Sequence, residues 1–276
     1  MKKDVGAAVL ETDTWPQPRR IGAINWLGLW TLTRREIMRF MKIYTQSLLA
    51  PTVMTLLFYA VFALAMGGNG RMMGTLPFMT FVTPGLIIMS VAPNAFFNTA
   101  VSLVLSKLQG NIVDMLMPPL SALELTIGYT LGGVARGVAV GVLSIAALAC
   151  VSDIVVLHRG YVIFHMVMGS MMLALIGLIT GICSKDFDHL GAVQNFIVLP
   201  ATFLSGTFYS INQLPGAWKL VCHLNPFFYM IDGFRYGFTG IADGSLYAGS
   251  WILVSVNLTM FLVAYILFAT GYKLKS

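Results

Sequence analysis

The chain has 276 residues, of which 57% are hydrophobic and only 10% are charged, and its mean hydropathy is +0.80. Soluble globular domains carry about 25% charged residues, so this composition excludes an ordinary soluble domain and predicts a polytopic membrane protein. The net charge of +6 does not indicate a nucleic-acid partner, because the lysines and arginines gather where a membrane protein keeps them.

The N-terminal region divides into two parts. Residues 1–22 are polar and contain two prolines, which predicts a flexible cytoplasmic tail. The first 42 residues lack the short apolar core and the cleavage site of a signal peptide, so we expect the first span to act as an uncleaved insertion signal. Residues 23–42 place tryptophans such as Trp30 on one side of a helical projection and cations such as Arg35 and Arg39 on the other. This pattern predicts an amphipathic membrane-surface helix, and the alternative is a cytoplasmic extension of the first span.

Long apolar segments fill the rest of the chain. Five runs without charge each exceed the ~20 residues that cross a hydrocarbon core, and a sixth, near 121–151, is interrupted only by Glu124 and Arg136. We therefore predict an all-α integral membrane domain over residues 43–276. Its six predicted transmembrane helices lie at about 43–66, 77–105, 121–150, 161–183, 190–209 and 250–272.

The distribution of lysine and arginine sets the expected orientation. With the N-terminus inside, twelve of these residues fall in the cytoplasm and four outside. Because cytoplasmic flanks of membrane proteins are enriched in positive charge, we expect both termini to be cytoplasmic. The external cations are Arg71, Arg159, Lys219 and Arg235.

The stretch from Pro200 to Gly240 is apolar but punctuated by proline and glycine, including Gly206 and Pro226. Proline removes a backbone donor and clashes with the preceding turn, so this stretch cannot form one straight spanning helix. We predict the end of a span followed by short broken helices at an external interface. Ten aromatic residues crowd the stretch; an interfacial belt explains most of them, and a lining for an amphipathic substrate is the alternative.

Motifs for covalent chemistry are missing from the sequence. There is no P-loop, no H-E-x-x-H and no G-x-S-x-G sequence, and the four histidines are scattered. The three cysteines show no metal-site spacing. We expect no catalytic residue, no metal site and no cofactor in this chain.

The cytoplasmic loop between the second and third spans has a structured pattern. Residues Gln109 to Met117 place apolar side chains along one side of a two-turn helix, which Pro118 would stop. Ser121 and Glu124 then form a predicted capping box at the start of the third span. Such a helix is usually a connector, but a stiff loop of this kind can also transmit force from a partner.

Charged residues inside apolar segments allow two interpretations each. Arg136 lies within the third span, where a charge is by default a functional candidate; pairing with a backbone carbonyl or with Glu124 is the structural alternative. Asp232 and Arg235 are three residues apart, which favours a local ion pair over substrate contact. The Gly137-x-x-x-Gly141 spacing allows close helix approach, and we expect packing within one subunit rather than a dimer motif.

Two runs carry a family resemblance. QGNIVDMLMPPLSALELTIGY follows the second span, and FLSGTFYSINQLPGAWKLVCHLNPFFYMIDGFRYG precedes the last. Together with the amphipathic N-terminal helix, they resemble the membrane subunit of type 2 ABC exporters, the permeases that export drugs and polysaccharides. The second run is the more specific, with F-x-S-G, an aromatic residue, L-P, N-P and a closing G-x-R. The similarity covers residues 24 to 275.

The resemblance implies a permease subunit that pairs with a second permease, as a homodimer or a heterodimer with the homodimer preferred, and with two P-loop ATPase subunits. ATP and Mg would be bound by the ATPase. The loop helix would be the coupling helix, and the segment after Tyr209 would form re-entrant external helices over the pathway. The coupling residues so implied are Gln109, Asn111, Ile112, Asp114, Met115, Leu116 and Pro118. Candidate pathway or gating residues are Arg136, Gly206, Tyr209, Asp232 and Arg235.

These expectations describe an export permease without enzymatic activity, multi-pass in the bacterial inner (cytoplasmic) membrane, with membrane lipids around it. An ion-coupled secondary transporter is the alternative, although it would need intramembrane carboxylates and repeat symmetry. A membrane-bound enzyme acting on lipid would need a clustered polar site. Small amphipathic compounds, lipids and lipid-linked glycans all remain open as substrates.

Overall fold

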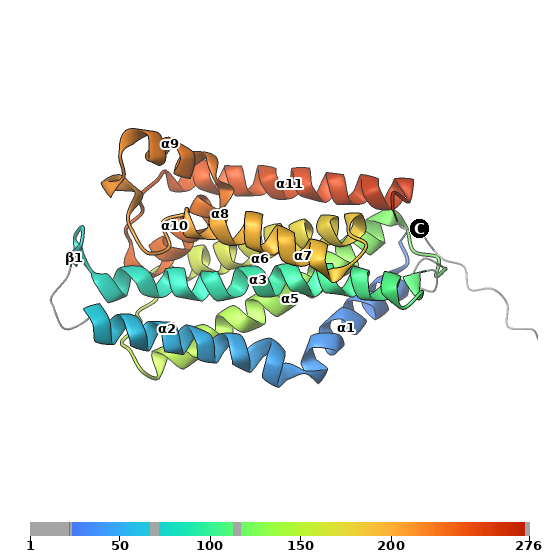
Figure 1. Ribbon diagram of the computed structural model, residues 1–276, viewed down its shortest axis with the longest axis horizontal. Helices are drawn as coiled ribbons and strands as arrows, with labels where there is room; N and C mark the ends of the chain where they lie inside the picture. The colour runs from blue at the N-terminus through green and yellow to red at the C-terminus, as the bar shows by residue number, and fades with distance from the viewer. Residues whose placement is uncertain (1–21, 23, 67–71, 113–116, 274–276) are drawn as a thin grey trace, which may run out of the picture.

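A computed structural model describes residues 22, 24–66, 72–112 and 117–273. Five of its helices are long and apolar enough to cross a membrane, at Thr45–Met66, Phe78–Leu108, Ala122–Ala149, Arg159–Cys183 and Leu246–Thr270. They run roughly along the long axis of the molecule (Figure 1). The prediction of an all-α membrane fold is confirmed.

The chain begins with helix α1 (Trp26–Lys42), which runs obliquely to the bundle (Figure 1). A five-residue π-helix, η1 (Thr45–Leu49), joins it to α2 (Ala50–Met66). Pro51 has no backbone N–H, so it cannot complete the ladder of hydrogen bonds with the preceding turn. The wider π turn just before it accommodates this break, which explains why α1 and α2 meet at an angle.

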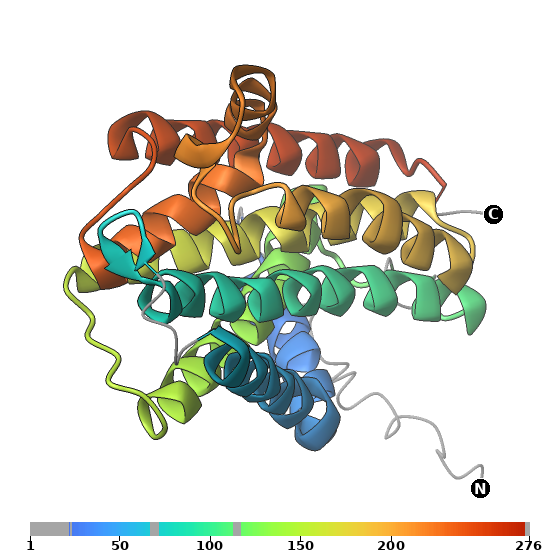
Figure 2. The ribbon, with the colours of Figure 1, turned by 60° about the vertical axis from the view of Figure 1, so that its left-hand side comes forward.

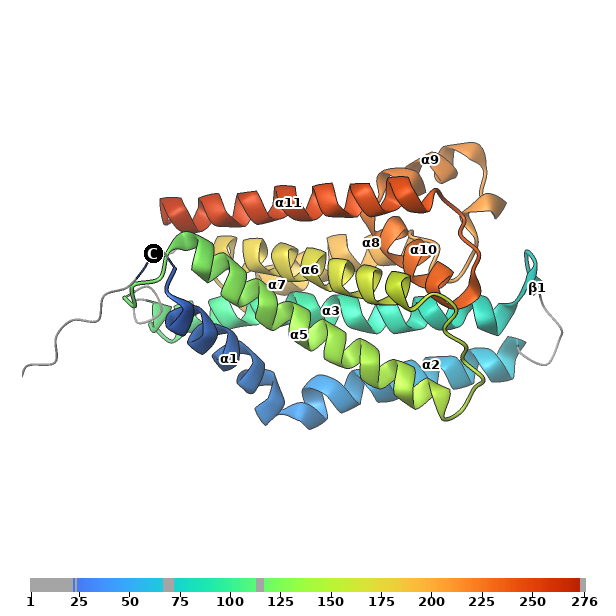
Figure 3. The same cartoon turned by 180° about the vertical axis from the view of Figure 1, so that it is seen from behind.

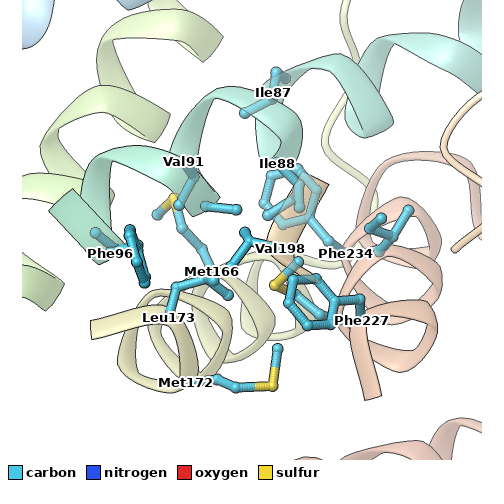
Figure 4. Close-up of a cluster of buried hydrophobic side chains, with 14 of the residues drawn as sticks. Ile87, Ile88, Val91, Phe96, Met166, Met172, Leu173, Val198, Phe227 and Phe234 are labelled. Atoms are coloured by element: carbon cyan, nitrogen blue, oxygen red, sulfur yellow. The ribbon is translucent and has the colours of Figure 1, made fainter. Parts of the chain in front are cut away.

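Helix α3 (Phe78–Leu108) is the centre of the molecule. It packs against α5 (Ala122–Ala149) and α6 (Arg159–Cys183), and Figure 2 shows it lying between α2 and α6. Two prolines, Pro84 and Pro93, lie inside α3 without ending it. Apolar side chains from α3 and α6 fill the core together with Val198 and phenylalanines of a later helix (Figure 4).

The segment predicted to span at 190–209 is an interrupted helix. It comprises α7 (Phe187–Val193), a second π-helix η3 (Gln194–Val198) and α8 (Leu199–Phe203). Pro200 again stands two residues after the end of a π-helix, as Pro51 does. The helix begins three residues earlier than predicted and ends at Phe203, because the chain then turns at Gly206, whose φ is +71°.

Short elements gather at the end of the bundle opposite the start of α1. They include a two-residue β-ladder of β1 (Met72–Met73) with β2 (Leu76–Pro77), which the all-α prediction did not contain. The others are a 3-10 turn η4 (Ile211–Gln213), α9 (Gly216–Leu224) and α10 (Pro226–Thr239). The predicted broken helices between Pro200 and Gly240 are therefore present. The last helix, α11 (Leu246–Thr270), returns along the outside of α6.

Close approach between helices depends on glycine. A Cβ at Gly137 would lie 2.6 Å from the hydroxyl of Ser170 on α6, and one at Gly141 would lie 2.6 Å from the sulfur of Met166. The Gly137-x-x-x-Gly141 pair thus packs inside the subunit against α6, as expected. Figure 3, seen from behind, shows α5 crossing obliquely in front of the other helices, with α1 alongside it.

Candidate functional site

The loop predicted to meet an ATPase begins where α3 ends. Gln109 is the C-cap residue of α3, and Gly110 turns the chain with a φ of +72°. The side-chain amide of Asn111 donates to the side-chain oxygen of Gln109 at 3.5 Å. Ile112 and Pro118 are described, but Asp114, Met115 and Leu116 lie outside the described residues. The coupling helix therefore stays a prediction.

The far end of this loop is tied to both α1 and α5. The predicted capping box is confirmed, since the Glu124 carboxylate accepts from the Ser121 N–H at 2.6 Å and the Ser121 hydroxyl accepts from the Glu124 N–H at 3.3 Å. The same carboxylate accepts a hydrogen bond from the backbone N–H of Asn25. Asn25 in turn donates its amide to the Pro119 carbonyl at 3.2 Å and caps α1. The start of α1, the loop and the start of α5 form one hydrogen-bonded unit.

Further along α1, a buried carboxylate joins this helix to α3. Glu36 is 0% exposed, and its carboxylate accepts hydrogen bonds from Arg35 at 2.9 Å, Arg39 at 3.0 Å and the Ser102 hydroxyl at 2.8 Å. The Arg39 guanidinium also donates to the Asn98 carbonyl of α3. A Cβ at Gly132 of α5 would overlap the Glu36 side chain. We call Glu36, Arg35, Arg39 and Ser102 the Glu36 cluster.

The Glu36 cluster gives the cationic side of α1 a partner that the helical projection did not identify. Arg35 and Arg39 lie on the side of α1 opposite Trp26 and Trp30, and both reach to Glu36. The face that packs on the bundle contains Leu29, Leu32, Glu36 and Phe40, and Trp26 and Trp30 are exposed instead. Burial opposes the charge of Arg35, yet the neighbouring Glu36 and Tyr129 leave its pKa raised. The arginine is therefore a permanent cation in this cluster.

A polar stripe continues from the Glu36 cluster along α3. Ser90, Asn94, Asn98, Ser102 and Ser106 recur every four residues, so they lie on one side of the helix. The Asn98 side chain is buried and neither its amide nitrogen nor its oxygen has a hydrogen-bond partner within the described residues.

Arg136 extends this stripe from α5, where its guanidinium donates to the Asn94 oxygen at 2.9 Å. The alternative of an Arg136–Glu124 pair is wrong, because Arg136 forms no ion pair in the part of the chain that the structure describes and Glu124 serves the capping box. Arg136 thus joins α5 to α3 through a neutral amide.

At the opposite end of the molecule, Asp232 and Arg235 hold the chain on either side of α10. The Asp232 carboxylate accepts from the backbone N–H groups of Asp243 at 2.8 Å and Gly244 at 3.0 Å. Arg235 is 2% exposed; it donates to the Gly206 carbonyl, lies 3.8 Å over the Phe81 ring and is 3.9 Å from the Asp243 carboxylate. The expected direct ion pair between Asp232 and Arg235 is not formed, because Asp232 binds the backbone of Asp243 and Gly244 while Arg235 reaches the Gly206 carbonyl and the Asp243 carboxylate; the two charges still attract each other.

Asp243 is the centre of this arrangement. Its carboxylate accepts from the Ser210 hydroxyl at 2.9 Å, the Ile211 N–H at 3.2 Å and the Asn212 amide at 3.1 Å. Burial raises the pKa of Asp232, against the effect of its two N–H donors, and burial lowers the pKa of Arg235 to about 10. Arg235 is therefore still a cation at neutral pH.

A cavity of about 270 Å³ opens beside these charges. Tyr209 lies next to it, packed on the small cluster around Ile211 and Phe228. The positive φ of Gly206 aims its carbonyl at Arg235. The cavity is lined by Met73, Gly74, Thr75, Leu76, Phe81, Ser210, Asn212, Gln213, Asp232, Arg235, Ile241 and Asp243. Of the predicted gating residues, Gly206, Asp232 and Arg235 are brought together here, whereas Arg136 belongs to the polar stripe.

Three features escaped the sequence-based prediction. Glu36 was overlooked because the arginines around it suggest a charged, exposed part of a membrane-surface helix. Asp243 lies in a short loop, and only the fold brings it to Arg235. The stripe from Ser90 to Ser106 had a readable signal, namely a polar residue at every fourth position. Among the described residues, no group of three His, Cys, Asp or Glu side chains could hold a metal ion.

Comparison with known proteins identifies the family. Residues 28–239 match the model of the family described as "ABC-2 type transporter". The "Inner membrane transport permease YadH" of Escherichia coli (strain K12) is 37% identical over 253 residues, covering 92% of this chain and 99% of that protein. "Nodulation protein J" of Rhizobium leguminosarum bv. viciae is 24% identical over 239 residues, covering 83% and 88%. The long apolar helices, the two sequence runs and this match over most of the chain agree: the protein belongs to the ABC-2 type transporter family.

Proposed function

We propose that this chain is the membrane-spanning permease subunit of an ATP-driven exporter, and that separate P-loop ATPase subunits drive it through the loop at 107–119. The observation that carries the proposal is the bonded unit of Asn25, Pro119 and Glu124. A displacement of the loop in this unit would move α1 and α5 together. Family membership supports the ATPase partner, and this chain has no P-loop of its own.

The Glu36 cluster extends this path into the membrane domain. Glu36 and Arg39 bind α1 to the side of α3, and Gly132 lets α5 approach the same point. Close-packed helices with shared buried charges shift as units rather than deform continuously. We therefore infer that ATP-driven motion of the loop changes the angle of α1, α3 and α5 with respect to the other helices.

We also propose a homodimer with the substrate path between two permease subunits, capped by α9 and α10. Arg235, Asp232 and Asp243 bind the segments around α10 to each other, so this region is built to move as one body. In the resting state it would close the outer exit. ATP binding would shift the population toward the open state.

Six crossings and two cytoplasmic termini are part of this proposal. The start of α1 and the end of α11 lie at the same end of the bundle (Figure 1). An even number of crossings follows, and the 17-residue segment from Phe187 to Phe203, about 25 Å long, supplies the sixth. The excess of lysine and arginine at that end supports a cytoplasmic orientation. The inner bacterial membrane is inferred from the name of the Escherichia coli relative.

The buried carboxylate of Glu36 is the observation that favours the alternative of an ion-coupled secondary transporter, since such transporters carry carboxylates at membrane depth. Two arginines and a serine already bind this carboxylate, so it has no vacant site for a coupling ion. The observation therefore favours a structural joint.

Co-purification and ATP hydrolysis test the proposal. The full chain is expressed with the P-loop ATPase encoded beside it, purified and reconstituted, and hydrolysis is measured with and without the permease. We expect the two to co-purify and Ile112→Asp to abolish the stimulation, because a charge would replace the apolar side chain that packs the start of the loop against the bundle. Lys219→Ala, at the external end, is the matched control. Absence of both association and stimulation in the wild-type chain would overturn the export proposal.

A further inference from the structure

A second cavity, of about 460 Å³, lies at the end of the bundle opposite the Asp243 site. It opens between the end of α6, the second half of α7 and the chain just after α11. Its lining residues are Ile179, Thr180, Cys183, Ser184, Lys185, His189, Ala192, Val193 and Lys273. Nothing in the proposed export cycle uses this cavity.

Local backbone structure brings the two lysines to this cavity. Helix α11 ends at Gly271, whose φ is +68°, with the Tyr272 N–H donating back to the Leu267 carbonyl at 3.2 Å. This left-handed cap reverses the chain and points Lys273 toward α6. Lys185 follows Ser184, the extended residue at which α6 ends. Both ammonium groups therefore stand where two membrane helices terminate.

The usual explanation for such lysines is that they satisfy the last carbonyls of a helix. Here another residue already does so, because Lys107 of α3 donates to the carbonyl of Ile182 and, at 3.1 Å, to that of Ser184. Neither Lys185 nor Lys273 has a hydrogen bond or ion pair to any residue that the structure describes. The Lys273 ammonium lies 5.5 Å from the centre of the ring of its neighbour Tyr272, a cation–π contact.

The charge of the cavity is positive. Its lining contains two lysines and one histidine and no carboxylate. The nearest acid, Asp186, already accepts from the ring nitrogen of His189 at 2.6 Å and from its backbone N–H at 3.1 Å. This contact lowers the pKa of Asp186, so the acid is ionised and directed at the histidine.

The remaining walls are apolar and continue toward lipid. Ile179, Ala192 and Val193 line the cavity. One turn beyond Val193, Phe196 is 82% exposed, and Ile266 on the last turns of α11 is also exposed. A ligand that fits this site has a negative head and an apolar body beside it.

We propose that this cavity binds the phosphate headgroup of an acidic phospholipid from the leaflet at that end, with Lys185 and Lys273 contacting the phosphate. Basic pockets between membrane helices on the cytoplasmic side are suited to anionic headgroups. The lipid would join α6, α7 and α11 at their ends, where the helices themselves share few polar contacts. The site does not depend on the export proposal, since it requires neither ATPase nor substrate.

The test uses the full chain, purified in detergent without the ATPase and stripped of lipid. Native mass spectrometry measures the binding of phosphatidylglycerol and, as a neutral headgroup, phosphatidylcholine. Each basic residue near an anionic lipid contributes about fivefold in affinity, so Lys185→Ser with Lys273→Ser should weaken phosphatidylglycerol binding by roughly 30-fold. Phosphatidylcholine binding should not change. The matched control is Lys219→Ser, a half-buried lysine at the other end, which donates to the Asn212 side-chain oxygen at 2.7 Å.

A charge-preserving variant protects the test from misfolding. Lys185→Arg with Lys273→Arg should bind phosphatidylglycerol within a few fold of the wild-type affinity, because the charges are kept. If the serine variant lost binding only through misfolding, the arginine variant would not be expected to retain it. Equal affinity of the serine variant and the wild-type chain for phosphatidylglycerol would overturn the proposal. So would displacement of the lipid by inorganic phosphate alone, because the site would then take free anions.

Discussion

Replacing the buried carboxylate of the Glu36 cluster with an amide should loosen α1 from the bundle. Glu36→Gln keeps the size of the side chain but removes the charge that Arg35 and Arg39 share at 2.9 and 3.0 Å. The new amide N–H₂ group would face a guanidinium, donor against donor. Because Glu36 is 0% exposed, water cannot replace the lost acceptor.

The expected loss of unfolding free energy depends on how far Arg35 and Arg39 are exposed to solvent. Removing one member of a fully buried ion pair costs about 3–5 kcal/mol. Arg35 and Arg39 keep 44% and 29% of their side chains exposed, so solvent screens part of that loss. We expect about 3 kcal/mol. For a chain of this size that corresponds to a fall of about 6–12 °C in the unfolding temperature.

The assay is thermal unfolding of the purified chain in detergent, followed by size-exclusion chromatography with fluorescence detection. Arg34→Gln is the matched control, since Arg34 is an exposed residue of the same helix. The double variant Glu36→Gln with Arg39→Gln should recover part of the loss, because it removes one uncompensated cation. A Glu36→Gln protein that unfolds within about 1 °C of the wild-type chain would refute the reasoning, since roughly 0.5 kcal/mol or less would then be at stake.

Two further substitutions probe packing and the external end. Gly85→Ala should lower the yield of folded, monodisperse protein, because its Cβ would lie 2.6 Å from the Thr207 carbonyl oxygen, a backbone atom that cannot rotate away. Gly191→Ala, where a Cβ meets nothing within 4 Å, should leave that yield unchanged. Asp243→Asn should increase protease cleavage between residues 204 and 213 on the external side, because the segment loses its charged acceptor.

Clear outcomes would contradict these two predictions. Equal yields of the Gly85 and Gly191 variants would mean that α3 and the turn after α8 have room to separate. Asp153→Asn serves as the control for Asp243→Asn, since Asp153 is an exposed acid in another loop. Equal cleavage in both variants would show that the Asp243 hydrogen bonds do not hold the segment.

Hydropathy and helix signals located most of the fold. Four of the six predicted spans agree with a long helix to within about four residues at each end, and the first begins within two residues of the prediction, with its initial turn in the π form. The capping box at Ser121 was readable because it depends on two residues three positions apart. The end of the fifth span was misjudged by six residues. The chain turns at Gly206, but hydropathy does not reveal this turn because the residues around it are mostly apolar.

The candidate sites were harder to predict because their partners are distant in sequence. A spacing of three residues suggested that Asp232 would pair with Arg235, yet backbone N–H groups 11 and 12 residues away bind the carboxylate better. Glu36 depends on Ser102, which is 66 residues away. Helical projection correctly found an amphipathic α1 but did not identify the partner of its arginines, because a single sequence does not show which neighbour will accept their hydrogen bonds.

The tie between the start of α1 and the start of α5 also has a consequence for biosynthesis. Asn25 and Glu124 are 99 residues apart, so α1 leaves the ribosome long before its anchor exists. At 5–20 residues per second, about 5–20 s pass before the third membrane helix begins to emerge. During that interval Glu36 and its arginines must remain hydrated at the membrane surface, because neither Ser102 nor Gly132 is yet available to cover them. Docking of α1 is therefore a late step, and insertion of α5 is the event that completes this half of the subunit.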